Sequence, residues 1–329
     1  MQEKSFAELG RIQAIRQLFE GSPYKPFGEP FCLKTTEGQS VVSASKLFLE
    51  GIDFNLVYFP YKHLGYKCAT ALAGELYSAF AQPKTLEVTL GISSKLDFAQ
   101  IEQLFSGIVT AATEHGVEQL SLDLLPSLNG LSISIHACGI RDQKWASTLP
   151  EPQSKDLICI SGCLGAAFLG QMVLEKKPSE LEKYKMMLAA YLKPELSAGM
   201  PERLREEGFH PTSCYFVTRG LSDAVKRLTR DCGLGAKVYA DKIPFEGNSF
   251  SLGKELDIDP ISAAMNGGDD YRLMLTLPIS EFERFRSEFP GFDIIGHLAQ
   301  KEVGTVLVSP DGLEHPMSAQ GWGEEKQYS

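Results

Sequence analysis

The stretch DLICISGCLGAAFLG, residues 156–170, is the part of the sequence that most clearly decides the fold of the second half of the chain. The apolar run Asp156–Ile160 predicts a buried strand, and the pattern from Ala166 to Leu174 predicts a helix. Glycines at such a strand-to-helix turn, here Gly162 and Gly165, let backbone N–H groups approach a phosphate. The turn matches neither GxGxxG nor the P-loop pattern. A tight turn that needs small residues for packing therefore stays the alternative interpretation.

A second turn, NGGDDY at residues 266–271, precedes the predicted strand Tyr271–Leu277. Its two glycines and two carboxylates could hold a metal ion or a polar ligand. Aspartates in turns also bond to their own backbone, so an ordinary turn is the alternative. The candidate residues are Gly267, Gly268, Asp269 and Asp270.

A third segment, YFVTRGLSD at residues 215–223, predicts a strand that turns at Gly220 and enters a helix. Arg219 could bind an anion or lie in solvent. Asp223, close to the helix start, is explained by its favourable interaction with the helix dipole.

Predicted strands and helices are mixed in both halves of the chain, which indicates an α+β protein of two domains. The segment 141–154, with two prolines, reads as a linker, and we place the domains at 1–145 and 146–329. In the first domain the residues from Leu131 to Cys138 alternate apolar and polar, as in a strand with one buried face. Phe6 to Phe19 predicts an amphipathic helix, and 31–33 with 41–49 predicts a hairpin.

Composition excludes several classes of protein. The net charge is −10, from 32 basic and 42 acidic residues. The sequence contains no long basic run with interleaved aromatic residues, so nucleic-acid binding is not expected. The N-terminus, MQEKSFAELGRIQAIRQLFE, lacks the apolar region of a secretory signal, and no apolar run has the length of a membrane span. Seven cysteines without a CxxC pair indicate free thiols in a reducing cytosol, so we expect a cytoplasmic protein. Cys163, in the first turn, is either an inert thiol or one activated by the helix N-terminus.

In this order the three turns resemble those of the thiamine-monophosphate kinase family, which is similar in fold to aminoimidazole ribonucleotide synthetase. The resemblance extends over nearly the whole chain. It also includes the segments Glu8–Gly10, Leu49–Leu56, His63–Lys67, Ala81–Pro83, Ile158–Gly170, Gly267–Leu275 and Gln320–Trp322.

The resemblance implies a homodimer whose N-terminal sheets form the interface, with a C-terminal α/β sandwich. It implies transfer of the ATP γ-phosphoryl group to thiamine monophosphate, with ATP and Mg²⁺ as cofactors. By the same resemblance, Gly162, Gly165, Arg219 and Gly220 would contact nucleotide or phosphate. Asp53, Gly267, Gly268, Asp269, Asp270 and Trp322 would contact substrate, although Trp322 could equally be a packing residue.

The sequence departs from the family pattern at the expected metal ligands. The acids that remain are Glu29, Glu75 and Asp123, whereas Pro30, the segment Ser43–Ser45 and Phe216 stand where the family has carboxylates. Arg219 replaces an aspartate. A positive charge about 4 Å from Mg²⁺ repels it by roughly 8 kcal/mol at an effective dielectric constant of about 20. Mg²⁺ binding is therefore doubtful, and Arg219 could pair directly with a phosphate instead.

Three functions stay open at this point. The chain is a working thiamine-monophosphate kinase, a catalytically inactive paralogue that binds a ligand or regulates, or an enzyme with a different reaction on the same fold. The last has no support from an N-terminal Cys-plus-Lys segment. The expected partner in each case is a small phosphate ester or nucleotide.

Overall fold

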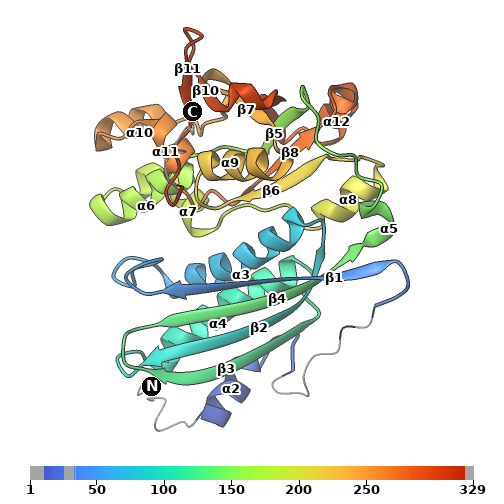
Figure 1. Ribbon diagram of the computed structural model, residues 1–329. Coiled ribbons are helices and arrows are strands. Elements are labelled where there is room, and N and C mark those ends of the chain that lie inside the picture. Colours follow the sequence, from blue (N-terminus) through green and yellow to red (C-terminus); the bar gives the residue numbers. More distant parts are fainter. Residues whose placement is uncertain (1–10, 26–32, 34, 323–329) are drawn as a thin grey trace. The chain divides into compact units, whose positions relative to one another are not determined.

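The computed structural model describes residues 11–25, 33 and 35–322 (Figure 1). It divides into two compact units. Unit 1 is Met1–Thr148 with Leu192–Glu207, and unit 2 is Leu149–Tyr191 with Gly208–Ser329. The division predicted from the sequence, at 145/146, puts Leu192–Glu207 in the second domain, whereas the structure groups this segment with unit 1. Local sequence patterns do not show that a chain returns to an earlier unit.

Unit 1 is built around a four-stranded sheet of order β1-β4-β2-β3, in which only β2 and β3 are parallel. Helix α4 connects these two parallel strands, as a βαβ crossover requires. The elements are α2 (Arg11–Phe19), β1 (Gln39–Leu49), α3 (Tyr61–Ser78), β2 (Gln82–Ser93), α4 (Phe98–Glu114), β3 (Gln119–Ser127), β4 (Ser132–Asp142), α5 (Gln143–Ala146) and α8 (Met200–Glu206).

Two glycines allow α3 and α4 to pack backbone against backbone. A Cβ atom on Gly65 would lie 1.9 Å from the Leu104 carbonyl oxygen, and one on Gly107 would lie 1.9 Å from that of Lys62. The two helices lie together on one face of the sheet (Figure 1). Asp97 caps α4 through a capping box with Gln100, which confirms the start predicted at Asp97.

The opposite face of this sheet, here called the open face, is polar in its middle. The predicted alternation in β4 is confirmed, because Ile133, Ile135 and Ala137 are fully buried while Ser134 is exposed. The register places Ser134 beside Thr89 of β2 and Leu47 of β1. The open face comprises Val41, Ser43, Ser45 and Leu47 of β1, Ser132, Ser134, His136 and Cys138 of β4, Glu87 and Thr89 of β2, and Ser121, Asp123 and Leu125 of β3.

Two predictions near the N-terminus fall partly on residues that the structure does not describe. The predicted helix begins in 1–10, outside the described part, and α2 is observed from Arg11. The predicted hairpin is not seen in the described residues, because β1 pairs along its length with β4 and residues 31 and 32 are not described. Strand β1 lies at an edge of the sheet order.

Unit 2 contains a seven-stranded sheet of order β11-β10-β7-β9-β5-β8-β6. Helix α11 contacts both α6 and α9. The elements are β5 (Leu157–Ser161), α6 (Ala166–Lys176), η1 (Leu181–Tyr184), α7 (Lys185–Leu192), β6 (Ser213–Val217), α9 (Leu221–Cys232), β7 (Gly235–Tyr239), η2 (Ala240–Lys242), α10 (Ser249–Leu256), α11 (Pro260–Asn266), β8 (Arg272–Leu277), η3 (Ile279–Glu281), α12 (Phe282–Glu288), β9 (Phe292–Ala299), η4 (Lys301–Val303), β10 (Thr305–Val308) and β11 (Glu314–Pro316).

The predicted elements of unit 2 are observed, and helices α10 and α11 are additional. A start signal for α11 was present in the sequence. Asp259 caps the helix by accepting from the Ser262 amide at 2.9 Å, and Pro260 occupies the first helical position. None of the helices in the described part of the chain is long and apolar enough to cross a membrane.

A buried histidine in unit 1 makes the stability of this unit depend on pH. The Tyr77 hydroxyl and His115 Nδ1 are 3.1 Å apart, and the Gly199 amide donates to the same hydroxyl at 3.2 Å. The other ring nitrogen, Nε2, has no hydrogen-bond partner among the described residues. Burial lowers the pKa of His115 to about 4, against a small opposing effect of Glu114. The folded state therefore favours the neutral ring.

We predict that acid destabilises unit 1 through this group. The His115 contribution is fully present above the unfolded pKa of about 6.5 and is lost as pH falls towards the folded pKa of about 4. A shift of this size corresponds to about 3 kcal/mol. Urea unfolding at several pH values should show this slope in the wild type and lose it in His115→Asn, whose Oδ1 can still accept from Tyr77. The exposed His315, changed to Asn, is the control and should retain the slope; an unchanged slope in His115→Asn would contradict the prediction.

Candidate functional site

The three turns singled out from the sequence lie together in unit 2. Strand β8 lies between β5 and β6 and runs antiparallel to both, so its start is beside their ends. The β5–α6 turn, the β6–α9 turn and the turn before β8 therefore meet at one end of the sheet. Direct hydrogen bonds and close backbone contacts connect them, as described next.

The β5–α6 turn depends on two glycines with positive φ. Gly162 and Gly165 both have φ +75°, a conformation that other residues rarely adopt. A Cβ atom on Gly165 would lie 2.8 Å from the Ala264 amide nitrogen of α11, which is too close. A Cβ atom on Gly162 would lie 3.2 Å from the guanidinium carbon of Arg272. The packing interpretation is thus supported at Gly165, where the neighbour is backbone, whereas at Gly162 the positive φ favours glycine and the Arg272 side chain can move.

Asp270 caps the N-terminus of α6 from inside the protein. Its carboxylate accepts from the Gly165 amide at 2.9 Å and from the Ala167 amide at 3.3 Å, and the residue is only 3% exposed. Burial raises the pKa of Asp270 to about 7, although both amides and Arg272 lower it. The amide that was predicted to face a phosphate therefore binds Asp270. Both residues thus position the turn, and their contacts with a ligand stay predictions.

Gly220 starts α9 in a conformation open only to glycine, with φ +90° and ψ 163°. A Cβ atom there would lie 2.4 Å from the Met265 carbonyl oxygen of α11. Gly220 therefore lets the two backbones come close together, and its contact with a phosphate stays a prediction.

Arg219 precedes this glycine and is exposed. Among the residues that the structure describes, it has no ion-pair or hydrogen-bond partner, unlike Arg272, whose Nε donates to the Cys163 carbonyl oxygen. Arg219 is thus a cation available to an anion at the junction of the turns. Arg272 itself was not singled out from the sequence, although its place directly after the acidic turn is a signal that could have been used.

The turn before β8 is partly strained. Asp269 and Tyr271 have φ +63° and +53°, although neither is glycine, and such residues often lie at functional sites. Their amides donate to Thr218 at 2.8 Å and Val217 at 3.0 Å, which tie the turn to the end of β6. Asp269 is partly exposed.

The two glycines of this turn allow close packing, and their contacts with a substrate stay predictions. A Cβ atom on Gly267 would lie 2.4 Å from the Ala263 carbonyl oxygen, and Gly268 is buried with φ +83° against Thr218. Four residues of this turn were predicted to contact substrate. Among them, Asp269 has a side chain that is partly exposed to solvent, and its backbone is strained.

Trp322 lies on α9. Its indole N–H donates to Asp223 at 2.9 Å, and the Lys226 and Arg230 cations lie 5.3 and 5.5 Å from its ring. Asp223 is 5% exposed and also accepts from Arg227 at 3.0 Å. These contacts agree with the packing alternative for Trp322. Asp223 does more than complement the helix dipole, because it accepts hydrogen bonds from two side chains.

The predicted ligands in unit 1 are engaged with protein groups. Glu75 pairs with Lys46 at 2.8 Å, and Asp123 accepts from the Leu124 amide at 2.9 Å. Asp53 accepts from the Leu49 amide at 2.7 Å and so closes its own turn. Glu29 lies outside the described residues. In the described part of the chain, no group of three or more histidines, cysteines or acids could hold a metal ion.

Cys163 is not an activated thiol. Burial and the nearby charge of Glu246 raise its pKa, and the opposing effect of Arg272 is smaller. A thiol with a raised pKa is a poor nucleophile at neutral pH, so the inert interpretation is supported.

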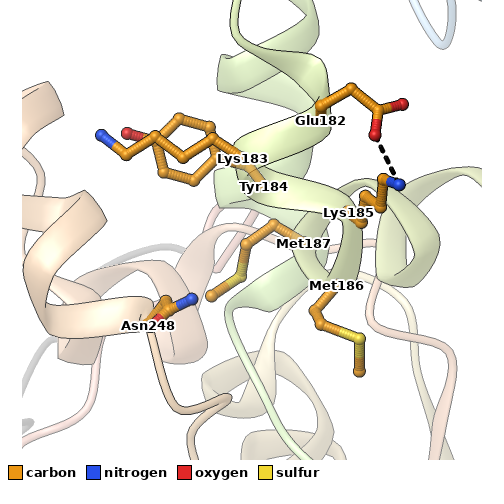
Figure 2. Close-up of a pocket in the computed structure, with 7 residues that line it drawn as sticks. All are labelled: Glu182, Lys183, Tyr184, Lys185, Met186, Met187 and Asn248. Atoms are coloured by element: carbon orange, nitrogen blue, oxygen red, sulfur yellow. Dashed lines mark ion pairs between the residues drawn. The ribbon is translucent and has the colours of Figure 1, made fainter.

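A small pocket elsewhere in unit 2 is lined by residues of η1 and α7 and by Asn248 (Figure 2). Its two cations have partners, because Lys185 pairs with Glu182 and Lys183 pairs with Glu255 at 3.1 Å. It contains none of the residues predicted from the sequence. The candidate site is therefore the junction of the three turns around Arg219.

No family model matches this chain. The thiamine-monophosphate kinase of Aquifex aeolicus (strain VF5) is 20% identical over 319 residues, which are 96% of this chain and 100% of that protein. Over nearly its whole length the chain is similar to proteins of the thiamine-monophosphate kinase family. This confirms the resemblance that the three turns indicated.

Solved structures of this family and of a related one have the same fold. AaThiL complexed with AMPPCP and TMP matches with a TM-score of 0.71 and 17% identity, covering 96% of this chain and 97% of that one. E. coli HypE, a hydrogenase maturation protein, matches with a TM-score of 0.69 and 15% identity, covering 93% and 96%. The predicted α+β, aminoimidazole ribonucleotide synthetase-like fold is thereby confirmed.

We predict that Gly220→Ala destabilises the protein by about 3 kcal/mol, because the alanine must leave a glycine-only conformation while its Cβ displaces α11. Gly233→Ala is the matched control. Gly233 also has positive φ, +70°, but a Cβ there has no described atom within 4 Å, so a loss of about 1 kcal/mol is expected. Chemical denaturation measures both, and equal losses would show that the contact with α11 is unimportant.

Proposed function

We propose that this chain is a thiamine-monophosphate kinase-like protein that binds a nucleotide or another small phosphate ester beside Arg219. The single observation that supports this is an exposed arginine, without a partner in the described residues, at the junction of three turns. A guanidinium binds phosphate oxygens through paired hydrogen bonds and carries its charge at any physiological pH. Related structures are described with AMPPCP and TMP, and with ATP, which supports the same class of ligand.

The family reaction would transfer the γ-phosphoryl group of ATP to thiamine monophosphate and give thiamine diphosphate. That chemistry depends on positioning and on Mg²⁺, which neutralises charge on the phosphates. We propose that most of the carboxylates that bind Mg²⁺ in this family are missing here. The chain would therefore bind its ligand but transfer little or no phosphoryl group. Arg219 and the Lys46–Glu75 ion pair support this version, because each places a cation where a metal ion would need negative oxygen.

A working kinase is the second candidate, and the identity with kinases over nearly the whole chain favours it. The surviving acids Asp123, Glu75 and Glu29 would then hold the metal ion, with Asp269 beside the substrate. The proposal also includes a cytoplasmic location, which the free cysteines among the described residues support.

We predict that Arg219→Ala weakens ATP binding about 10-fold or more, since one charge-assisted hydrogen-bonding group contributes roughly 1.5–3 kcal/mol. Isothermal titration should show binding by the wild type both with Mg²⁺ and with EDTA. Arg286→Ala, which removes an exposed arginine of α12, is the control and should leave the affinity unchanged. Unchanged affinity in Arg219→Ala would refute the assignment of the site.

The same samples distinguish the two candidate functions. Thiamine diphosphate formation at a normal enzyme rate, on the order of 1 s⁻¹ or faster, would show a working kinase. No turnover together with retained ATP binding would support the ligand-binding protein. No nucleotide binding at all would exclude the working kinase and leave only a ligand other than a nucleotide.

We also propose that the open face of unit 1 forms the interface of a homodimer, as the resemblance implies. Val41, Leu47 and Leu125 on this face are 49%, 57% and 45% exposed. The small polar residues between them give a flat surface that a second sheet can approach closely. Exposed apolar side chains rimming such a face are typical of an interaction surface.

We predict that Leu47→Glu weakens self-association at least about 10-fold, because it places two like charges, one from each copy, in an apolar contact. Sedimentation velocity over a concentration series measures the change. Leu313→Glu is the control, since Leu313 is also exposed, at 58%, but lies in unit 2. A wild-type protein that is monomeric at all concentrations would contradict the proposed dimer.

A further inference from the structure

An ion pair in unit 1 involves one of the residues predicted to bind metal. The Lys46 ammonium nitrogen lies 2.8 Å from Glu75 Oε1, and the two side chains are only 26% and 28% exposed. Lys46 comes from β1 and Glu75 from α3, so the pair connects the sheet to the helix that covers it.

The position of Lys46 is unusual for a lysine. The residues of β1 alternate, and Lys46 is on the less exposed side, opposite the exposed Ser45 and Leu47. Its register partner on β4 is Ile135, which is fully buried. A lysine at such a place loses part of its hydration, and the carboxylate of Glu75 compensates for that loss.

We propose that the Lys46 ammonium group takes the place of a divalent cation at Glu75, so that this carboxylate is paired without Mg²⁺. Mg²⁺ is held by one or two carboxylates together with water, and a cation at hydrogen-bonding distance from the carboxylate opposes its approach. An ammonium group fixed to the strand supplies positive charge at this point permanently. This inference does not depend on the ligand of unit 2, because its test uses no nucleotide.

An inward charge on an edge strand has a second explanation. Edge strands often carry such charges, which prevent pairing with other sheets. On that explanation the sign of the charge is unimportant, and an aspartate at position 46 would serve equally well without any response to Mg²⁺.

The test reverses the charge at position 46 and measures thermal unfolding with MgCl₂ or with EDTA at equal ionic strength. In Lys46→Asp two carboxylates face each other, and Mg²⁺ alone should raise the midpoint temperature by roughly 2–4 °C. The wild type should have the same midpoint in both buffers. A folded Lys46→Asp variant that does not respond to Mg²⁺ would overturn the proposal and favour the edge-strand explanation.

A second variant keeps the proposal testable if Lys46→Asp does not fold. Glu75→Gln removes the carboxylate and leaves Lys46 in place, and it should lower the midpoint equally in both buffers. If instead Mg²⁺ stabilises the wild type and Glu75→Gln abolishes that stabilisation, then Glu75 binds the metal ion and Lys46 does not replace it. This result would leave ligand binding at Arg219 untouched, but it would remove the support that the Lys46–Glu75 ion pair gives to a chain without phosphoryl transfer.

Discussion

The arrangement of the candidate site depends on one buried carboxylate. Asp270 accepts hydrogen bonds from two amides at the start of α6, and so connects the turn before β8 to the turn after β5. The next residue on either side, Asp269 and Tyr271, is held by the backbone at the end of β6. Three segments that are distant in the sequence thus share one hydrogen-bonded junction, and Arg219 is left exposed beside it.

This junction shows which part of the candidate site can be read from the sequence and which part cannot. Strands followed by glycines could be read from local pattern, and the order of the three turns indicated the family. Local pattern does not show which hydrogen-bond partner each polar group has. Gly165 and Asp270 are 105 residues apart, so nothing in the local sequence shows that the amide of one is satisfied by the other. The same holds for Trp322, whose partner Asp223 is 99 residues away.

In unit 1, too, the partner of a charged side chain cannot be read from the local sequence. The sequence shows that residue 75 is an acid. Whether its carboxylate can bind a metal ion depends on the cation beside it, which is Lys46. A lysine within an alternating strand is usually exposed, so local pattern alone does not suggest that Lys46 pairs with Glu75. The period-two pattern itself places Lys46 on the less exposed side, so this residue could have been noticed.

The bond between Trp322 and Asp223 has a consequence for how the protein is made. Asp223 is buried at the start of α9, yet its second donor is synthesised 99 residues later. At a translation rate of about 5–20 residues per second, this interval is roughly 5–20 s. During that time the nascent second unit carries a carboxylate with only Arg227 as side-chain donor. The hydrogen bond from Trp322 to Asp223 can therefore form only after residue 322 has emerged from the ribosome.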